Sequence, residues 1–468
     1  MPINSFDNYP MSWKPDLTNV AGPIYRALAI MLEEDIKTGK LMPGTKLPPQ
    51  RELADYLDIN LSTISRAYKL CEQNGLISAS IGNGTYVSSD AGTNPILTPN
   101  PENTQNIDMG AILPNTKPNK KLVEYIQKML TEPEAEKLFG YGITGGTPSQ
   151  KDAAVKWMEK AKYNVDPQQI LFSCGGQNAI TAVLASLFKA GDKIGTDPLT
   201  YPGIKTAAKM LGIQLVPIDW EDGEITQEGL MNACKNDKIK GLYIIPDFHN
   251  PTAHIMSLKT RKMIAEIGRQ YHIIIIEDAI NSLLKEDPIP PVASFAAEQT
   301  IYILSLSKII SPGLRLAYLA VPEAYRKEVS TGIYNMDISI SPFILELASR
   351  LIHSKKADVI AAERRQYTRE QNEIVDRHLG KYEIYGEIDC PFRFIYLPEV
   401  FTGISFEICA KNEGVQVFSA ERFLVGNSRS RGAVRISVTA ARDSAEFEDG
   451  IRILKRILES EDMTDILL

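Results

Sequence analysis

A chain of 468 residues is too long for one ordinary domain, so we expect two or three. The formal net charge of −7 excludes a broadly basic surface, so any contact with nucleic acid must come from a local patch. The five cysteines contain no C-x-x-C pair, which predicts reduced thiols and no metal site. No signal sequence and no apolar run of about 18 residues is present, so we expect a cytoplasmic protein without membrane contact.

Residues 1–20 predict an irregular arm, and residues 21–88 predict three helices followed by two short strands. Apolar residues at helical spacing place the first helix between Pro23 and Gly39. Asn60 is the expected N-cap of the third helix. The residues that this helix directs inward are Ile64, Ala67, Tyr68 and Cys71.

Three helices closed by a two-stranded wing form a winged helix-turn-helix. Short hydroxyl side chains at the head of the third helix let the backbone approach a major groove, and Arg66 can reach a guanine edge or a phosphate. The sequence from Leu47 to Val87 resembles the DNA-binding domain of the GntR regulator family, which implies binding to double-stranded promoter DNA. The implied contact residues are Arg51, Ser62, Thr63, Ser65 and Arg66, with the wing glycines Gly82 and Gly84. We expect Lys46 and Lys69 on the same side.

The charge of this first domain leaves an alternative. Residues 1–90 contain eight Lys and Arg against ten Asp and Glu, so the alternative is an ordinary helical bundle with a solvated polar face. Residues 89–106 are rich in Pro, Asn and Thr, and they predict an extended linker to the rest of the chain.

Residues 107–468 alternate between strand and helix patterns, which is typical of an α/β domain with a mostly parallel, buried sheet. The predicted strands are 170–173, 193–196, 214–217, 241–245, 273–277, 300–304 and 316–320, and helices are predicted at 178–189 and 258–271. Ligands of such sheets bind at the carboxyl ends of the strands, so we expect the functional residues there.

The strand at 300–304 is followed by two hydroxyls and an amine, Ser305, Ser307 and Lys308, and a Pro-Gly turn then brings back Arg315. An amine forms a Schiff base with an aldehyde, and hydroxyls with a guanidinium hold a dianionic phosphate. Pyridoxal phosphate requires this set, with Lys308 as the point of attachment. The alternative is a solvated lysine after a strand.

Three further sites fit the same cofactor. The strand-to-helix turn of Gly175, Gly176 and Gln177 offers amides to a phosphate, although such turns are common in other proteins. Tyr201 offers a ring to stack on a flat cofactor, although a tyrosine by itself is more often part of a core. Asp278 ends an apolar strand, where a carboxylate needs a cationic partner such as a protonated pyridine nitrogen. The alternative for Asp278 is a helix cap.

In this order along the chain, the motifs resemble the fold-type I, pyridoxal phosphate-dependent enzymes of the aminotransferase class. The resemblance implies that Asn250 bonds the hydroxyl of the cofactor ring and that Arg435 binds the α-carboxylate of an effector. It also implies that Tyr141 reaches the phosphate of a neighbouring subunit, and therefore that the protein is a homodimer.

The chain departs from this family at three places. A tyrosine usually follows the aspartate by two or three residues, where Ile280 and Asn281 stand here. Ala253 replaces the usual glycine of the Asn-Pro-Thr-Gly turn, and His249 stands where glutamine is common. These changes predict a site that holds the cofactor but is handicapped in repeated transamination.

A GntR-type head, a linker and an aminotransferase-like body together resemble the MocR subgroup of bacterial regulators. The resemblance implies a transcription factor that responds to pyridoxal phosphate, or to an amino compound through it. A PdxR-type regulator of vitamin B6 synthesis is the version that the missing tyrosine favours, whereas Arg435 favours an amino-acid effector. The alternatives are an active aminotransferase with an accessory DNA-binding domain, and a repressor whose body serves only for dimerisation.

Overall fold

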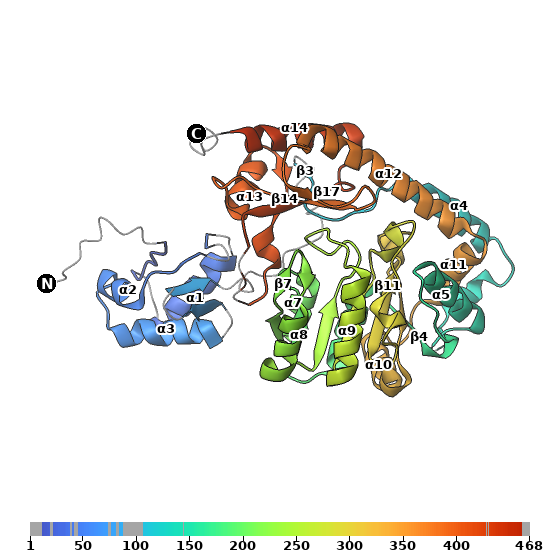
Figure 1. The fold of residues 1–468 in the computed structure, drawn as a ribbon, viewed down its shortest axis with the longest axis horizontal. Helices are drawn as coiled ribbons and strands as arrows, with labels where there is room; N and C mark the ends of the chain where they lie inside the picture. Colours follow the sequence, from blue (N-terminus) through green and yellow to red (C-terminus); the bar gives the residue numbers. More distant parts are fainter. Residues whose placement is uncertain are drawn as a thin grey trace. The chain divides into compact units, whose positions relative to one another are not determined.

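The computed structural model describes residues 12–18, 22–37, 40–41, 45–73, 76–80, 84–87, 106–143, 145–426, 428 and 430–460. The chain divides into two compact units, Met1–Ile96 with Glu421–Ser430, and Leu97–Ala420 with Arg431–Leu468. Below, residues 12–87 are termed the head and the second unit is termed the body (Figure 1). No described helix is long and apolar enough to cross a membrane. Most of the predicted arm and linker lies outside the described residues.

The head contains three helices and a two-stranded antiparallel sheet. Its elements are α1 (Ile24–Lys37), α2 (Gln50–Tyr56), α3 (Leu61–Gln73), β1 (Ile77–Ser80) and β2 (Gly84–Val87). Ile77 pairs with Val87 in the register of this sheet. The predicted winged helix-turn-helix is confirmed.

Local chemistry explains where the helices of the head begin and what they bury. Asn60 Oδ1 accepts the backbone N–H of Ser62 at 2.9 Å, as predicted for an N-cap. The four residues predicted to face inward from α3 are all buried, because they recur on one face of the helix. Trp13, which lies in the predicted arm, is buried in the same core and donates from Nε1 to Asp35 Oδ2 at 2.9 Å.

The body is built on a seven-stranded sheet of order β4-β12-β11-β10-β9-β5-β6. In that order the strands are Ile170–Ser173, Ala317–Ala320, Thr300–Ser305, Ile274–Asp278, Gly241–Ile244, Lys193–Thr196 and Gln214–Pro217. All neighbours are parallel except that β12 runs antiparallel to both β11 and β4. The parallel strands therefore bring their carboxyl ends, and the loops that follow them, to one edge of the sheet.

Helices cover both faces of this sheet (Figure 1), and alternating side chains of a strand point to opposite faces. On β11, Ile301 and Ile303 join one core with α6, α7 and α10, whereas Tyr302 and Leu304 join another with α5, α11 and α12. A third core joins α8 and α9 to β9 and β10. The helices are α5 (Pro148–Lys160), α6 (Gly176–Leu187), α7 (Pro202–Met210), α8 (Gln227–Asn232), α9 (Leu258–Tyr271), α10 (Glu323–Asp337), α11 (Pro342–His353) and α12 (Lys356–Leu379).

A second, four-stranded antiparallel sheet lies in the C-terminal part of the body, in the order β13-β14-β17-β16. Its strands are Ile384–Tyr385, Phe392–Tyr396, Ala433–Ser437 and Phe418–Ser419, with helices α13 (Gly403–Asn412) and α14 (Ser444–Glu459). The remaining elements are β3 (Ile107–Asp108), α4 (Asn119–Leu130), β7 (Trp220–Glu221), β8 (Glu224–Ile225) and β15 (Val415–Gln416). Strand β3 pairs with β15, so the start of the body is joined to its C-terminal part.

One fully buried arginine fixes the loop that follows β9. Arg261 on α9 donates from Nη2 to Asp247 Oδ1 at 2.6 Å and from Nε to the carbonyl of Met256 at 3.1 Å. The other oxygen of Asp247 accepts from the hydroxyl of Ser282 at 2.5 Å. These bonds join the loop after β9 to α9 and to the loop after β10.

The substitution Arg261→Leu should destabilise the body by about 3–5 kcal/mol, because the carboxylate of Asp247 stays buried without its cation. Urea unfolding followed by tryptophan fluorescence measures this, since Trp157 and Trp220 lie in the body. The control is Arg326→Leu, whose ion pair joins a half-buried guanidinium to the exposed carboxylate of Glu323 and contributes about 1 kcal/mol or less. Equal losses in the two variants would contradict the role of the Arg261 pair.

Candidate functional site

The predicted phosphate residues converge at the carboxyl edge of the seven-stranded sheet. Gly175 has φ +97°, and a Cβ built there would lie 2.8 Å from Arg315 Nη2. A Cβ on Gly176 would lie 3.6 Å from the Cβ of Ser305, whose hydroxyl donates to Ser307 Oγ at 3.0 Å. Backbone amides at the start of α6, two hydroxyls and a guanidinium are thus brought together from three separate segments, which is the donor set for a phosphate.

Lys308 is half-buried beside this cradle. Its Nζ donates to the carbonyl of Ile112 at 2.6 Å. Burial lowers the pKa of the amine to about 8, with further lowering by Arg435 and Arg315, while Asp278 opposes the shift. At pH 7 roughly a tenth of an amine with this pKa is neutral, against roughly one in three thousand for an ordinary lysine. The neutral amine is the nucleophile, so the surroundings of Lys308 favour attack on an aldehyde.

Asp278 is buried at the end of β10, and burial raises its pKa to about 6. Two donors oppose that shift: the hydroxyl of Tyr243 donates to Oδ2 at 2.8 Å, and the backbone N–H of Ile280 donates to Oδ1 at 3.2 Å. Sequence reasoning missed Tyr243. Its signal was a lone tyrosine in the apolar strand 241–245, but only the adjacency of β9 and β10 brings its hydroxyl to the carboxylate.

Tyr201 and Gln177 share a close contact with a glycine. A Cβ on Gly203 would lie 2.2 Å from the ring of Tyr201 and 2.0 Å from Gln177 Oε1. The amide of Gln177 donates to the carbonyl of Gly203 at 3.0 Å. Burial raises the pKa of the Tyr201 hydroxyl to about 12; Asp278 raises it further, and Arg315 and Arg435 lower it. These influences show that the Tyr201 ring lies among the other site residues.

Arg435 and Asn250 contact each other directly. Arg435 is buried on β17, donates from Nη1 to Asn250 Oδ1 at 2.6 Å and from Nη2 to the carbonyl of Gly110, and lies over the rings of Phe392 and Phe418. A carboxylate that bound this guanidinium would therefore compete with protein oxygens.

The chemistry of this set fits an anionic aldehyde. The groups that act on Lys308 include two cations, Arg315 and Arg435, and one carboxylate, Asp278, so positive charge is in excess. A dianionic phosphate balances that excess, and Asp278 is left to pair with a protonated ring nitrogen. Among the described residues, no three His, Cys, Asp or Glu side chains are placed to hold a metal ion.

The structure gives other tasks to the residues at the three departures. Asn281 is buried and donates from Nδ2 to the carbonyl of Phe248 at 2.9 Å, so it positions the loop that carries Asn250. Ala253 takes the left-handed backbone conformation, φ +60°, in which a Cβ is strained by about 1–2 kcal/mol. His249 contacts Thr252 through Nδ1 at 2.8 Å, and its Nε2 lies 3.5 Å from Asp197 Oδ2.

Tyr141 lies outside this cluster. Its side chain is 90% exposed, on the segment between the Ala135–Phe139 turn and α5. The exposed ring is available to another molecule.

The predicted DNA contacts lie on the head. Exposed side chains belong to Lys46, Arg51, Ser62, Arg66 and Lys69, and half-buried ones to Thr63 and Ser65. The hydroxyl of Ser65 donates to Gln50 Oε1 at 2.7 Å, which ties α3 to the start of α2. Gly84, at φ +106°, passes close to Lys46, since a Cβ there would lie 3.0 Å from its Cε. Gly82 lies outside the described residues.

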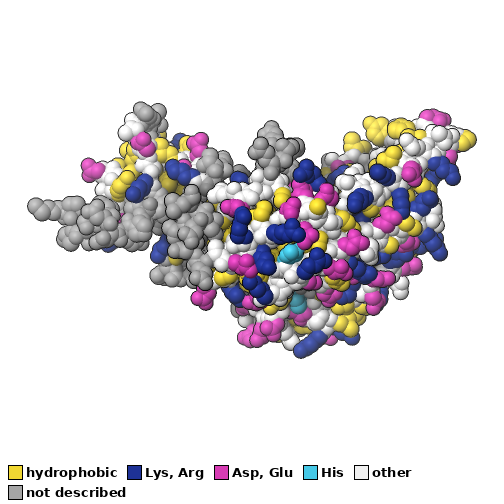
Figure 2. Space-filling view, turned by 90° about the horizontal axis from the view of Figure 1, so that it is seen from above, with side chains coloured by type: hydrophobic (Ala, Val, Ile, Leu, Met, Phe, Trp, Pro, Cys, Tyr) yellow, Lys and Arg dark blue, Asp and Glu magenta, His cyan; other side chains and the backbone are white. Residues whose placement is uncertain are grey.

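One face of the body carries charges of both signs side by side. Figure 2 shows Lys and Arg intermixed with Asp and Glu over the face of the body that it presents. On that face, the described residues form no extended basic stripe of the kind that holds a phosphate backbone.

Two family models match the chain. The model "Bacterial regulatory proteins, gntR family" matches residues 24–87, and the model "Aminotransferase class I and II" matches residues 107–454. A Bacillus subtilis relative, the uncharacterized HTH-type transcriptional regulator YdeF, is 50% identical over 98% of this chain and 99% of its own length. The chain belongs to the GntR family of transcriptional regulators, in its MocR architecture.

Other relatives of this regulator share the arrangement or the fold. The Staphylococcus aureus regulator NorG is 22% identical over 87% of this chain and 97% of its own length. The crystal structure of an archaeal alanine:glyoxylate aminotransferase superposes with a TM-score of 0.71, at 22% identity, over 77% of this chain and 92% of that one. The kynurenine aminotransferase of Pyrococcus horikoshii gives 0.69 at 22% identity, over 77% and 93%. The predicted fold-type I architecture of the body is confirmed.

The substitution Arg66→Ala should weaken binding to promoter DNA by about 1–3 kcal/mol, because it removes a guanidinium from the head of α3. Fluorescence anisotropy measures this at fixed salt, with duplexes that the wild-type protein has selected from a random pool. The control is Arg26→Ala, an exposed arginine of α1 outside the predicted contacts. An Arg66 variant that binds like the control would refute the assignment.

Proposed function

We propose that this regulator binds pyridoxal phosphate through Lys308 and that the bound cofactor changes the affinity of the GntR-type head for promoter DNA. The observation that carries the proposal is the convergence of one activated amine, one phosphate cradle and one buried carboxylate at the same edge of the sheet. We propose that the regulator acts in the cytoplasm, because promoter DNA and the cofactor are both present there.

Each residue has a defined task toward the cofactor. The amides of Gly175 and Gly176, the hydroxyls of Ser305 and Ser307 and the guanidinium of Arg315 hold the phosphate. Tyr201 stacks on the ring, Asn250 bonds its hydroxyl, and Gln177 holds the backbone of the turn that carries Tyr201. Asp278 keeps the ring nitrogen protonated, with Tyr243 holding the carboxylate in place. When bound, the cofactor supplies an aldehyde that reacts with amines and a ring that withdraws electrons.

Control of vitamin B6 synthesis is the regulatory role that we favour. Neither Ile280 nor Asn281 supplies a phenol near the ring, and Asn281 is used to hold the carbonyl of Phe248. A sensor of the cofactor itself needs no such phenol, because it does not process a second ligand. Steady turnover of an amino acid with a keto acid would instead assign an aminotransferase, and an operator affinity moved only by an amino acid would assign an amine sensor.

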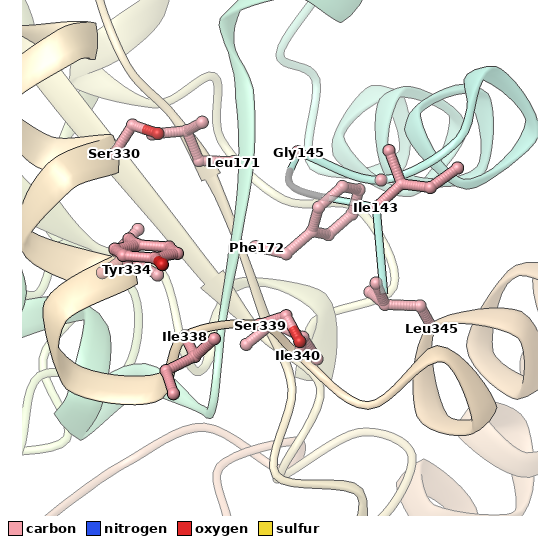
Figure 3. A pocket seen from close by; sticks show the side chains of 12 residues that line it. Ile143, Gly145, Leu171, Phe172, Ser330, Tyr334, Ile338, Ser339, Ile340 and Leu345 are labelled. Atoms are coloured by element: carbon pink, nitrogen blue, oxygen red, sulfur yellow. The ribbon is translucent and has the colours of Figure 1, made fainter. Parts of the chain in front are cut away.

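We further propose that the regulator is a homodimer with shared sites. Large apolar side chains are exposed beside a pocket on the body (Figure 3). Ile143 is 69% exposed and Ile338 is 56% exposed, and both line the pocket, as does Tyr334. Phe172 also lines it and lies three residues before Gly175, so a partner that covers this surface brings its own Tyr141 toward the phosphate cradle.

Pyridoxal phosphate added to the purified protein should produce visible absorption and change operator affinity by roughly 5- to 150-fold. Lys308→Ala should show neither effect, because it lacks the amine. Absorption spectra and anisotropy titrations on the same samples measure both effects. The control is Lys189→Ala, which removes an exposed lysine that is distant from Lys308 in the sequence. A wild-type protein that shows no visible absorption once unbound cofactor has been removed would overturn the proposal.

Tyr243→Phe should raise the pKa of Asp278 above its present value of about 6, because the carboxylate loses a donor that favours its charged form. Protonated Asp278 no longer pairs with a protonated ring nitrogen. The pH midpoint at which the bound cofactor loses its absorption on acidification should therefore move upward. Tyr302→Phe is the control, since Tyr302 is equally buried on β11 but lies near Glu277. Matching shifts in both variants would count against the Tyr243 bond.

A further inference from the structure

The first described segment of the body, residues 106–115, is held by three cationic side chains, two of which belong to the candidate site. It is termed the leading segment, because it follows the head and residues 88–105 in the chain. Arg435 donates to the carbonyl of Gly110, Lys308 donates to the carbonyl of Ile112 at 2.6 Å, and Arg364 donates to the carbonyl of Asn115. Three backbone carbonyls within six residues thus accept from three different cations.

Other bonds of the leading segment keep its amides from solvent. The N–H of Ile107 donates to the carbonyl of Gly414 at 2.8 Å, and the N–H of Met109 donates to the carbonyl of Gln416 at 2.9 Å. Asp108 Oδ1 accepts the N–H groups of Gly110 and Ala111 at 2.9 and 3.1 Å. These amides report on whether the segment stays in place.

Two of the three cations are the groups that a ligand would engage, and the third is not. Lys308 is the amine proposed to take the cofactor, and Arg435 is the predicted clamp for a carboxylate. Arg364 on α12 is buried and also donates to the carbonyl of Ile310, so the Asn115 end of the segment is anchored independently of the ligand groups.

We infer that the leading segment is a latch that the cofactor opens: Lys308 cannot both carry the cofactor and hold the carbonyl of Ile112. This rests on the proposed function. Reaction of the neutral amine with the aldehyde forms a carbon–nitrogen double bond, and the aldehyde oxygen leaves as water with both amine hydrogens. The nitrogen then carries at most one proton, which is shared with the ring hydroxyl oxygen, so Ile112 loses its donor.

The position of the leading segment in the chain gives this release a regulatory consequence. The segment begins where residues 88–105 end, and those residues connect the body to the DNA-binding head. A bond at Lys308 therefore acts on the place where the chain from the head joins the body.

Hydrogen exchange of the full-length protein, read by mass spectrometry, tests the latch. Peptides covering residues 107–112 should exchange roughly five-fold faster after addition of pyridoxal phosphate, the factor expected for loss of one ordinary hydrogen bond. In Lys308→Ala they should exchange fast without cofactor and show no further change. Lys308→Arg keeps a donor but cannot form the double bond, so its peptides should stay slow with or without cofactor. Peptides of β11 serve as the internal control.

The outcomes distinguish failure of the latch from failure of the proposed cofactor binding. Visible absorption together with unchanged or slower exchange at residues 107–112 would overturn the latch and leave a cofactor-binding regulator. Fast exchange in both Lys308 variants would also overturn it, because the donor would then not be what holds the segment. No visible absorption in the wild-type protein would overturn the proposed function and the latch together.

Discussion

An excess of positive charge at one edge of a parallel sheet is the constraint on which the site depends. Lys308, Arg315 and Arg435 lie near one another, and Asp278 is the carboxylate that acts on the Lys308 amine there. Charges held away from water destabilise a fold unless they are paired or hydrogen-bonded. Here backbone carbonyls accept hydrogen bonds from Lys308 and Arg435, which stabilises part of the positive charge. The remaining positive charge favours binding of an anionic ligand. A side chain at Gly175 would occupy the space of the Arg315 guanidinium, and one at Gly203 would occupy the space of Gln177 and Tyr201.

Much of the fold followed from residue patterns, because the central strands β9, β10 and β11 are largely apolar and the other strands are short segments bounded by turns. The strands predicted at 170–173, 193–196 and 214–217 match the structure at both ends, and α9 matches at 258–271. The second sheet was not predicted. Its strands are short and separated by loops of varied length, so no local period indicates them, and they pair only because distant segments fold together.

The site divides in the same way between local and distant contacts. Ser305, Ser307 and Lys308 are adjacent in the chain, so their shared location was accessible from sequence. The hydrogen bond from Tyr243 to Asp278 joins neighbouring strands that lie 35 residues apart in the chain, and the bond from Arg435 to Asn250 spans 185 residues. Such pairs require the strand order and register, which composition and spacing do not contain. The roles of the Gly110 and Ile112 carbonyls could not be predicted for another reason. Every residue has a backbone carbonyl, so the residue type does not indicate which of them accepts a side-chain donor.

Gly203 sets a limit on how this body can change over evolution. Its missing side chain leaves room for Gln177 and for the ring of Tyr201, both of which a methyl group would strike. No single substitution at that position can add a side chain beside Tyr201 without displacing both neighbours. Leu284 and Pro391 border a separate cavity next to Lys308, so substitutions there can change its lining without this conflict.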